Sequence, residues 1–362
     1  MAHSVYIHIP FCKQKCKYCS FISFTNNDKI LGYIFSLLKE IDTNYNGEIL
    51  KTLYFGGGTP SLIEAQYLKK IINKFYLDSS CEITLELNPD DANFDYLKSL
   101  RDIGINRLSI GSQTFDDEIL KLIGRRHNSS QTIKAIELAK QAGFDNISLD
   151  LIYGLPTQTI ESLQKDLEII TDLKIQHIST YGLKIEEDSY WGNFPPQNIP
   201  DEDLQADMYL FINEYLENKG YKRYEISNFA LKGFESKHNL NYWNNDEYYG
   251  FGVAAHGYIE GIRYSNFTTI EKYLNNPISH EQGHFQTDKE KLEEEIFLGF
   301  RKNEGINISK IKDVFGINFE EKYKAVLDKF MPNYIEKTPQ GYKLTLQGVL
   351  LSNNILSEFL DD

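Results

Sequence analysis

Three of the four cysteines in this chain lie within a stretch of eight residues. Cys12, Cys16 and Cys19 form a C-x3-C-x2-C arrangement, whereas Cys81 stands apart from them. A disulfide framework uses an even set of cysteines in an oxidising compartment, and this sequence indicates neither. Iron–sulfur clusters are normally held by four cysteine thiolates, so three thiolates leave one iron of a 4Fe-4S cluster open to a small molecule. The spacing therefore favours an iron–sulfur cluster.

Two other interpretations of these cysteines stay open at this point. A zinc site could use His8 as its fourth ligand, or the cysteines could be unrelated buried thiols. Zinc sites usually pair ligands from two separated segments, such as two C-x2-C pairs, or C-x2-C with H-x3-H. The sequence shows no second segment of this kind, which weighs against zinc.

The elements that must position the cysteines alternate between short apolar runs and amphipathic helical patterns. Such alternation predicts a parallel sheet with crossover helices, either an open barrel or a doubly wound fold. Polar residues and glycines follow several of the expected strands, and in a barrel that end of the strands is where active sites are built. The six expected strands cover residues 5–9, 53–55, 83–87, 107–111, 146–154 and 177–183.

The second half of the chain departs from this alternation. A proline-containing loop near 195–200 is followed by an expected helix near 201–219 and by an aromatic-rich region over 221–273. Expected helices at 288–301, 309–315 and 319–330 then precede two extended segments, 334–338 and 342–346, and a last helix over 348–360. Helices followed by a hairpin suggest a small winged-helix-like module. We therefore expect three parts, residues 1–190, 191–287 and 288–362.

The charge balance restricts the classes of partner. The chain has 38 Lys and Arg residues against 52 Asp and Glu residues, a formal net charge of −14. Nucleic-acid binding depends on basic residues that neutralise phosphates, so a general nucleic-acid role is excluded. No stretch approaches 18 uncharged apolar residues, and the first residues lack the features of a secretory signal. We expect a cytoplasmic protein with no transmembrane segment.

The segment YIHIPFCKQKCKYCSF (6–21) resembles the cysteine motif of radical S-adenosylmethionine proteins. This resemblance implies an open (β/α)6 partial TIM-type barrel, followed here by a C-terminal α+β region that includes the winged-helix-like module. It also implies that the open iron binds the amino and carboxylate groups of S-adenosylmethionine, which an electron from the cluster then cleaves to a 5'-deoxyadenosyl radical. The protein holds these groups, and the radical chemistry belongs to them.

Further motifs resemble one branch of these proteins, the oxygen-independent coproporphyrinogen III oxidases and the related HemW-type haem chaperones. The motif GGGTPS (56–61) could by itself be only a tight turn, because successive glycines serve both turns and close approach to a ligand. The resemblance spans nearly the whole chain. The other motifs follow in the family's order as LELNP (85–89), RLSIGSQTF (107–115), LIGRRH (122–127) and SLDLIYGLPTQT (148–159).

The resemblance assigns cofactor contacts residue by residue. Tyr6, Gly57 and Glu86 match the first S-adenosylmethionine site, where a carboxylate can accept charge-assisted hydrogen bonds from the cofactor. Without the resemblance, Asp150 could cap or pair with another group at a strand end, and Arg125 could form a surface ion pair. A second cofactor also need not persist in every branch of the family. The positions that match a second S-adenosylmethionine site in the oxidase are Tyr18, Gly58, Thr59, Gln113, Arg125 and Asp150.

Three features favour the chaperone branch over the oxidase. The oxidase has a fourth cysteine where this chain has Phe21, and it carries a long extension before the motif. HNLNYW (238–243) also fits the HNxxYW pattern associated with HemW-type chaperones. The resemblance thus implies a protein that binds haem as cargo and delivers it to an acceptor protein, for which a respiratory enzyme is one option.

The HNxxYW motif supplies the candidate haem residues. His238 could ligate haem iron through an imidazole nitrogen, with Tyr242 and Trp243 near a porphyrin face. In the simpler interpretation, His238 is a hydrogen-bonded loop residue and the two aromatic residues belong to a domain interface. Further candidates for the same surface are Tyr224, Asn228 and His256.

Two other functions stay open. As an oxidase, the protein would abstract hydrogen from propionate side chains and decarboxylate them to vinyl groups. That acidic substrate needs a basic pocket, and Arg125-Arg126 is the only pair of adjacent arginines. As a third option, cluster and cofactor could serve only as a structural switch in a binding protein.

Overall fold

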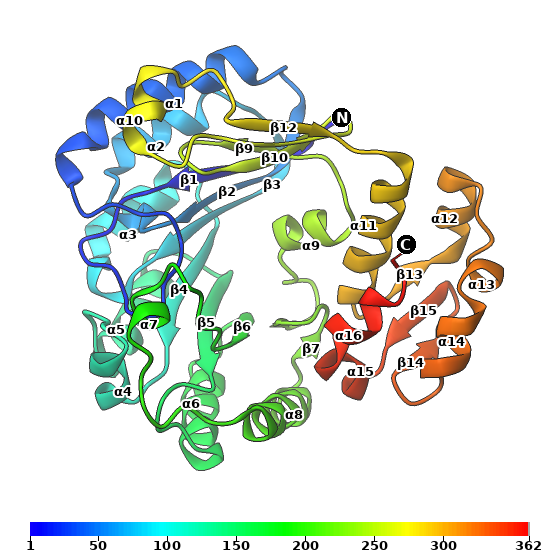
Figure 1. Ribbon diagram of the computed structural model, residues 1–362. Helices are drawn as coiled ribbons and strands as arrows, with labels where there is room; N and C mark the ends of the chain where they lie inside the picture. Colours follow the sequence, from blue (N-terminus) through cyan, green and yellow to red (C-terminus); the bar gives the residue numbers. More distant parts are fainter. Residues whose placement is uncertain (361–362) are drawn as a thin grey trace.

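One curved sheet of nine strands organises the computed structural model, which describes residues 1–360. Six parallel strands form its middle and confirm the six expected strands (Figure 1). They are β1 (Ser4–Ile9), β2 (Ile49–Gly57), β3 (Tyr76–Leu87), β4 (Arg107–Gln113), β5 (Ile147–Tyr153) and β6 (His177–Gly182).

Helices connect these strands and cover the convex side of the sheet (Figure 1). The strands run side by side in chain order, so each connection is a crossover between parallel neighbours, as in a partial barrel. Short 3-10 turns at Asn27–Lys29, Pro60–Leu62 and Pro89–Asp91 follow the first three strands. The helices are α1 (Ile30–Asn44), α2 (Ala65–Ile72), α3 (Phe94–Asp102), α4 (Asp117–Leu122), α5 (Ser129–Gln141) and α6 (Ile160–Asp172).

The two faces of the sheet have opposite chemistry. Successive side chains on a strand point to opposite faces. On β4, Leu108 and Ile110 are fully buried in the core beneath the helices. The alternate residues Arg107, Ser109 and Gly111 line a cavity on the concave side instead. A barrel interior normally filled by branched apolar side chains is therefore polar here, as a ligand site requires.

Three short strands extend the sheet beyond the six that the sequence predicts. They are β7 (Lys222–Arg223), β8 (Asn228–Ala230) and β9 (Tyr249–Phe251). β8 pairs antiparallel with β6, β7 pairs antiparallel with β8, and β9 pairs parallel with β1. A strand of two or three residues is too short to show a period-two pattern, so the expectation of six strands was incomplete.

The aromatic-rich region contributes a helix on the concave side and a small second sheet. Figure 1 places α9 inside the curve of the large sheet. The second sheet is antiparallel, in the order β10-β11-β12. The elements of this region are α7 (Tyr190–Asn193), α8 (Glu202–Asn218), α9 (Lys237–Trp243), β10 (His256–Ile259), β11 (Ile262–Ser265), α10 (Ile270–Asn275) and β12 (Gln282–Phe285).

The C-terminal part has its own hydrophobic core, which includes Phe300, Phe319 and Phe359 and also takes in Tyr209 of α8. The expected single helices over 319–330 and 348–360 are wrong, because each is split where the backbone leaves helical torsion angles, at Tyr323 and Leu351. Strand β13 was not expected. The elements are α11 (Asp288–Arg301), β13 (Ile306–Asn307), α12 (Ile308–Phe315), α13 (Phe319–Lys322), α14 (Lys324–Phe330), β14 (Ile335–Lys337), β15 (Gly341–Leu344), α15 (Leu346–Leu350) and α16 (Ser352–Ser357).

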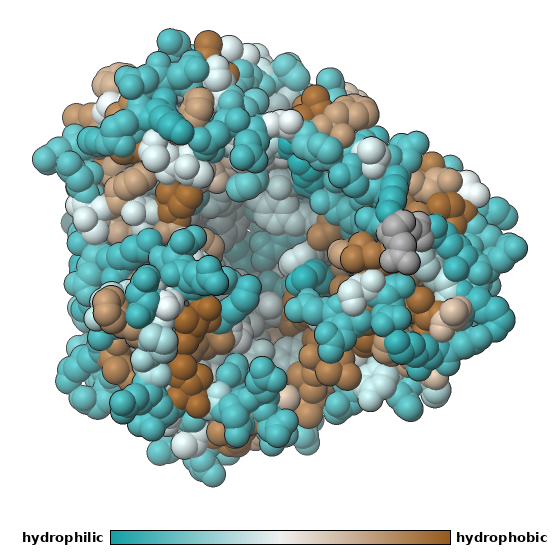
Figure 2. All heavy atoms as spheres, in the orientation of Figure 1, coloured by the Kyte–Doolittle hydropathy of each residue, from teal (hydrophilic) through white to brown (hydrophobic). Residues whose placement is uncertain are grey.

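None of the helices within residues 1–360 combines the length and apolar character that crossing a bilayer requires. In space-filling view, a hollow lies between the strands of the large sheet and the C-terminal part of the chain (Figure 2).

Candidate functional site

A cavity of about 520 Å³ lies on the concave side of the sheet, at the carboxyl ends of the strands. Because the strands are parallel, the segments that follow them meet at this one edge. All the residues that the resemblance assigns to the cluster and the cofactor line the cavity, except Tyr6. They are Cys12, Cys16, Cys19, Tyr18, Gly57, Gly58, Thr59, Glu86, Gln113, Arg125 and Asp150.

The cysteine loop is held to the strands by backbone hydrogen bonds. The Cys12 N–H donates to the Phe24 carbonyl over 2.9 Å, and the Lys17 N–H donates to the Ile123 carbonyl over 3.0 Å. Cys12 is buried, and Cys16 and Cys19 are half-buried. The Thr59 hydroxyl lies 3.4 Å from the Cys12 sulfur. Three thiols from one short loop thus face a single cavity.

This donor set fits a cluster better than a lone metal ion. Within residues 1–360, no three Cys, His, Asp or Glu side chains are arranged to hold one metal ion. The ligands of a 4Fe-4S cluster each bind a different iron, so they surround a larger volume. His8 is also engaged: its Nδ1 lies 3.0 Å from the Tyr6 hydroxyl and its Nε2 lies 3.0 Å from the Ile22 carbonyl oxygen. Burial lowers the pKa of His8 to about 4.

Arg125 brings a positive charge to the cysteines. Its Nη1 lies 3.6 Å from the Cys16 sulfur, and its Nη2 donates to Asn88 Oδ1 at 2.8 Å and to the Gly111 carbonyl at 2.7 Å. The suggestion of a surface ion pair at Arg125 is therefore wrong, since the neighbouring Arg126 makes that contact, with Asp90. A guanidinium beside thiolate sulfurs offsets their negative charge.

The glycine run lets the backbone approach its neighbours closely. Gly57 has a φ of +112°, and a Cβ there would lie 2.6 Å from the His8 ring. At Gly58 a Cβ would lie 2.8 Å from the Phe11 carbonyl oxygen. The turn at GGGTPS is therefore tight and forms a wall of the cavity, and its close approach to a ligand stays a prediction.

Glu86 places a carboxyl group in the middle of the cavity lining. Its Oε1 accepts from the Tyr54 hydroxyl at 2.9 Å and its Oε2 accepts from the Gly57 N–H at 3.0 Å. Burial and the nearby Asp150 carboxylate raise the pKa of Glu86 to about 7. Burial also raises the pKa of Asp150, which accepts from the Ser109 hydroxyl at 3.1 Å. Both carboxyls would be better satisfied by a ligand that carries positive charge or hydrogen-bond donors.

Arg107 is a cavity residue that the sequence analysis missed. It is only 2% exposed, its Nε has no hydrogen-bond partner in the described residues, and it lines the same cavity. The Arg107 charge lowers the pKa of the nearby Asp150 carboxyl, and its buried Nε–H is left able to donate to a ligand. The available signal was its position: Arg107 and Ser109 alternate with apolar residues along β4.

Helix α9, which contains the HNxxYW motif, is fixed at its N-terminus. The Glu82 carboxylate accepts from the backbone N–H groups of Lys237 and His238, each at 3.2 Å. His238 is 1% exposed. Its Nδ1 lies 2.8 Å from the Thr52 hydroxyl and its Nε2 lies 2.9 Å from the Tyr242 hydroxyl. Burial, reinforced by Arg107, lowers the pKa of His238 to about 3.

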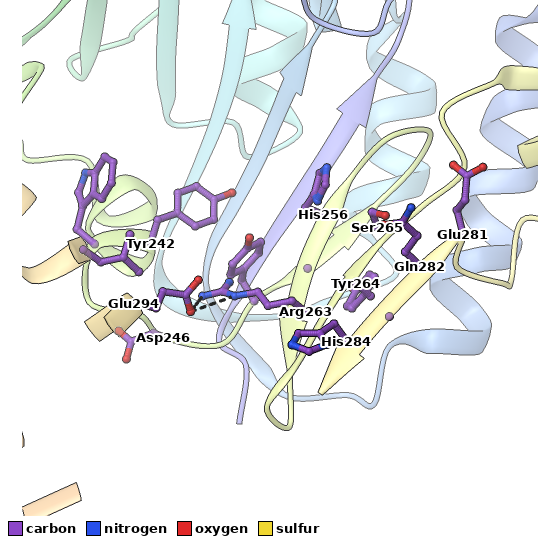
Figure 3. Close-up of a pocket in the computed structure, with 15 residues that line it drawn as sticks. Tyr242, Asp246, His256, Arg263, Tyr264, Ser265, Glu281, Gln282, His284 and Glu294 are labelled. Atoms are coloured by element: carbon purple, nitrogen blue, oxygen red, sulfur yellow. Dashed lines mark hydrogen bonds and ion pairs between the residues drawn. The ribbon is translucent and has the colours of Figure 1, made fainter. Parts of the chain in front are cut away.

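A second cavity, of about 1040 Å³, is drawn in Figure 3 and shares no lining residue with the first. Tyr242 and Trp243 line it from α9, and the β10–β12 sheet and α11 contribute further lining residues. Asn239 of the same helix lines the first cavity. Helix α9 therefore contributes side chains to both cavities.

The candidate haem residues are thus divided. His238 does not line the second cavity, whereas Tyr242 and Trp243 do. Among the further candidates, only His256 lines it. The Tyr224 hydroxyl instead lies 2.7 Å from Nε2 of His177, on the β6 side of the sheet. The expectation that Tyr224, Asn228 and His256 share one surface with the motif was therefore wrong for the first two.

Comparison with known proteins agrees with this architecture. Residues 6–170 match the radical SAM superfamily, and residues 286–351 match the HemN C-terminal domain. The chain is similar over 98% of its length to the structure of coproporphyrinogen III oxidase (HemN) from Escherichia coli, with 89% of that chain covered and a TM-score of 0.86. The identity to that enzyme is 23%, so this likeness speaks for the fold.

Full-length relatives are more similar in sequence to this chain than that oxidase is. The proteins named heme chaperone HemW from Lactococcus lactis and Bacillus subtilis are 39% and 38% identical to this chain. The alignments cover 99% of this chain and 98% and 99% of those proteins. The Escherichia coli protein of the same name is 33% identical over 99% of this chain and 98% of its own length.

Fold and sequence together define a radical SAM protein, a class that implies a 4Fe-4S cluster and S-adenosylmethionine. Within this class, the chain belongs to the family of the heme chaperone HemW proteins.

Proposed function

We propose that this chain is a cytoplasmic haem chaperone that binds haem and transfers it to an acceptor protein. The observation that carries the proposal is the second cavity, which Tyr242 and Trp243 line and which shares no lining residue with the cofactor cavity. A carrier needs a place for its cargo that the cofactor does not occupy. The names of its full-length relatives support the same function.

In this proposal Cys12, Cys16 and Cys19 ligate a 4Fe-4S cluster, and the fourth iron position is left for S-adenosylmethionine. When bound, the cluster supplies one-electron chemistry to the cofactor. Arg125 would offset the negative charge of the thiolates, since its Nη1 lies 3.6 Å from the Cys16 sulfur.

The cofactor would be held by the polar walls of the first cavity. Tyr6, Gly57 and Glu86 would form the first S-adenosylmethionine site, with the Glu86 carboxylate accepting hydrogen bonds from the ligand. Tyr6 would act from behind this wall, where its ring stacks on Tyr54 at 6.1 Å between centroids. A second S-adenosylmethionine would use Tyr18, Gly58, Thr59, Gln113, Arg125 and Asp150, all of which line the cavity.

The cargo would lie against the aromatic side chains of α9, with the porphyrin near Tyr242 and Trp243. For His238 to ligate iron, it would have to give up hydrogen bonds of 2.8 and 2.9 Å and come out from behind Tyr242. The acceptor is a protein that uses haem, and a respiratory enzyme fits this description.

The function can be tested with anaerobically reconstituted full-length protein. It should bind haem stoichiometrically and should not decarboxylate coproporphyrinogen III. Efficient conversion of that compound to protoporphyrinogen would contradict the chaperone function and favour the oxidase.

The cluster assignment is tested by Cys16→Ala, with Cys81→Ala as the matched control. Cys81 is a buried cysteine on β3 that does not line the cavity. Cys16→Ala should fold but lose iron, sulfide and the broad visible absorption of the cluster, and Cys81→Ala should retain all three. Full iron and sulfide in Cys16→Ala would exclude Cys16 as a ligand.

A further inference from the structure

Among the described residues, the second cavity contains one histidine, His256, with both ring nitrogens free of hydrogen bonds. The chain has eight histidines, and seven of them have at least one ring nitrogen in a hydrogen bond. Within residues 1–360, His256 is the exception, with no hydrogen-bond partner at either ring nitrogen. Its side chain is exposed and lines the second cavity.

The position of His256 is set by the small antiparallel sheet. It is the first residue of β10, where it pairs with Ser265 of β11, and Ser265 pairs with Gln282 of β12. Residues in register across a sheet present their side chains to the same face. Figure 3 shows His256 on this sheet and Tyr242 on α9 facing the same pocket. A flat ligand in the pocket would meet an imidazole on one side and aromatic rings on the other.

The other histidine of this cavity is already engaged. His284 lies on β12, and its Nε2 is 2.8 Å from the Glu290 carboxylate. Its side chain is exposed, but the hydrogen bond to Glu290 leaves only Nδ1 available to a metal. His284 therefore serves as an internal control for His256.

The charges of the cavity also indicate the orientation in which haem would bind. Arg263 is the only Lys or Arg in the lining, and its Nη2 lies 2.6 Å from Glu294, while its guanidinium stacks 3.9 Å from the Tyr258 ring. The lining also contains Asp246 and Glu281. Such walls repel propionates and tolerate the positive charge of ferric iron. The propionate edge would therefore face solvent.

We propose that His256 supplies the axial imidazole nitrogen to haem iron in the second cavity, and that Tyr242 and Trp243 flank the porphyrin. The inference rests on the proposed chaperone function and names the cargo site within it. His238 then has a positioning role, because its Nε2 holds the Tyr242 hydroxyl at 2.9 Å. A neutral imidazole with a free nitrogen is the usual protein ligand of haem iron.

The test is ferric haem titration of the full-length, cluster-loaded protein and of three variants: His256→Ala, His284→Ala and His238→Ala. The low-temperature EPR spectrum of the ferric haem reports its axial ligand, because an oxidised 4Fe-4S cluster gives no such signal. Changes to outer-shell partners of a metal already cost about 10–100-fold in affinity, so His256→Ala should weaken haem binding by at least about tenfold. It should also remove the imidazole-ligated spectrum.

The controls separate the possible outcomes. His284→Ala should keep both affinity and spectrum, and all variants should keep the iron and sulfide of the cluster. His256→Cys should bind haem with a thiolate-type spectrum, which a purely structural residue would not produce. An unchanged spectrum in His256→Ala, or its loss only in His238→Ala, would overturn the inference. If the unsubstituted protein binds no haem, the chaperone function itself fails.

Discussion

Glu86 should make the binding of S-adenosylmethionine depend on pH near neutrality. Burial and the neighbouring Asp150 raise the pKa of this carboxyl to about 7 in the cofactor-free protein. A cofactor that donates to Glu86 binds the ionised form, so binding must remove the proton at lower pH. The perturbations are therefore the pH itself and Glu86→Gln, which keeps the shape of the side chain but cannot ionise.

The size of the effect follows from the pKa. A carboxyl with a pKa of about 7 is about 9% ionised at pH 6 and about 91% ionised at pH 8, so affinity should rise about tenfold over this range. Stability should change in the opposite direction. Because folding raises the pKa of Glu86 from its ordinary value of 4.5, the contribution of Glu86 to stability is present below pH 4.5 and is lost as the pH rises through about 7. Between pH 6 and 8 this loss amounts to about 1 kcal/mol in the free energy of unfolding.

Isothermal titration calorimetry provides the assay. S-adenosylmethionine is titrated into the reconstituted protein from pH 6 to 8, in buffers of different ionisation enthalpy that report proton release. Release should approach one proton at pH 6 and fall toward zero at pH 8. Asp150 also has a pKa raised by burial, and because its charge interacts with Glu86, the difference between the two proteins reports Glu86 together with its effect on Asp150.

Glu186→Gln is the matched control, because Glu186 lines the same cavity and makes its ion pair with Lys184 at 2.7 Å. It should keep the tenfold rise that Glu86→Gln loses. An equal rise of affinity in Glu86→Gln, or no rise in the unsubstituted protein, would refute the role of Glu86.

Two substitutions test residues that hold the walls of the cavities in place, Glu82 and Arg107. Glu82→Ala removes the acceptor for the N–H groups of Lys237 and His238, which should cost about 1–3 kcal/mol in urea unfolding. Glu64→Ala is the control, because Glu64 lies at the start of α2 and its side chain makes no capping hydrogen bond. It should lower the free energy of unfolding by less than about 0.5 kcal/mol. Equal losses in Glu82→Ala and Glu64→Ala would contradict the role of Glu82. Arg107→Met removes a positive charge that lowers the pKa of the buried Asp150 carboxyl, so the free energy of unfolding at pH 8 should fall by up to about 3 kcal/mol, and unchanged stability would show that Arg107 does not support Asp150.

The sequence predicts those strands of the large sheet that are long enough to show an alternating pattern of apolar and polar residues. The six central strands are six to twelve residues long, and each alternates between the helical core and the cavity. Strands β7, β8 and β9 have two or three residues; β8 pairs with β6, β9 pairs with β1, and β7 pairs with β8. The partners of β8 and β9 in the large sheet lie far away in the chain, and strands this short carry no local pattern that indicates the pairing.

The first cavity was largely predictable because motifs that follow parallel strands converge at one edge. The sequence did not identify Arg107 as a cavity residue, because a charged residue at the start of a strand usually faces solvent. Only the direction of its side chain, toward the concave side, shows that it belongs to the site.

The HNxxYW motif shows where spacing alone misleads. In a helix, residues four apart share a face, so His238 and Tyr242 contact each other, but only Tyr242 and Trp243 line the second cavity. The sequence suggested that all three residues contact haem, but the side of the helix that contains His238 packs against the large sheet. Thr52 takes one nitrogen of His238, and no helical pattern could identify a partner 186 residues away.

Helix α9 also explains how one protein can use a cofactor cavity and a cargo cavity together. Glu86 in the first cavity accepts from the Tyr54 hydroxyl at 2.9 Å, and the Tyr54 ring stacks on His238 at 4.9 Å between centroids. His238 in turn holds Tyr242, which lines the second cavity. These contacts are continuous, so in the proposed function a ligand bound to the Glu86 carboxylate would influence Tyr242 through Tyr54 and His238. Because coupling between two sites is reciprocal, haem against Tyr242 would act on Glu86 through the same side chains.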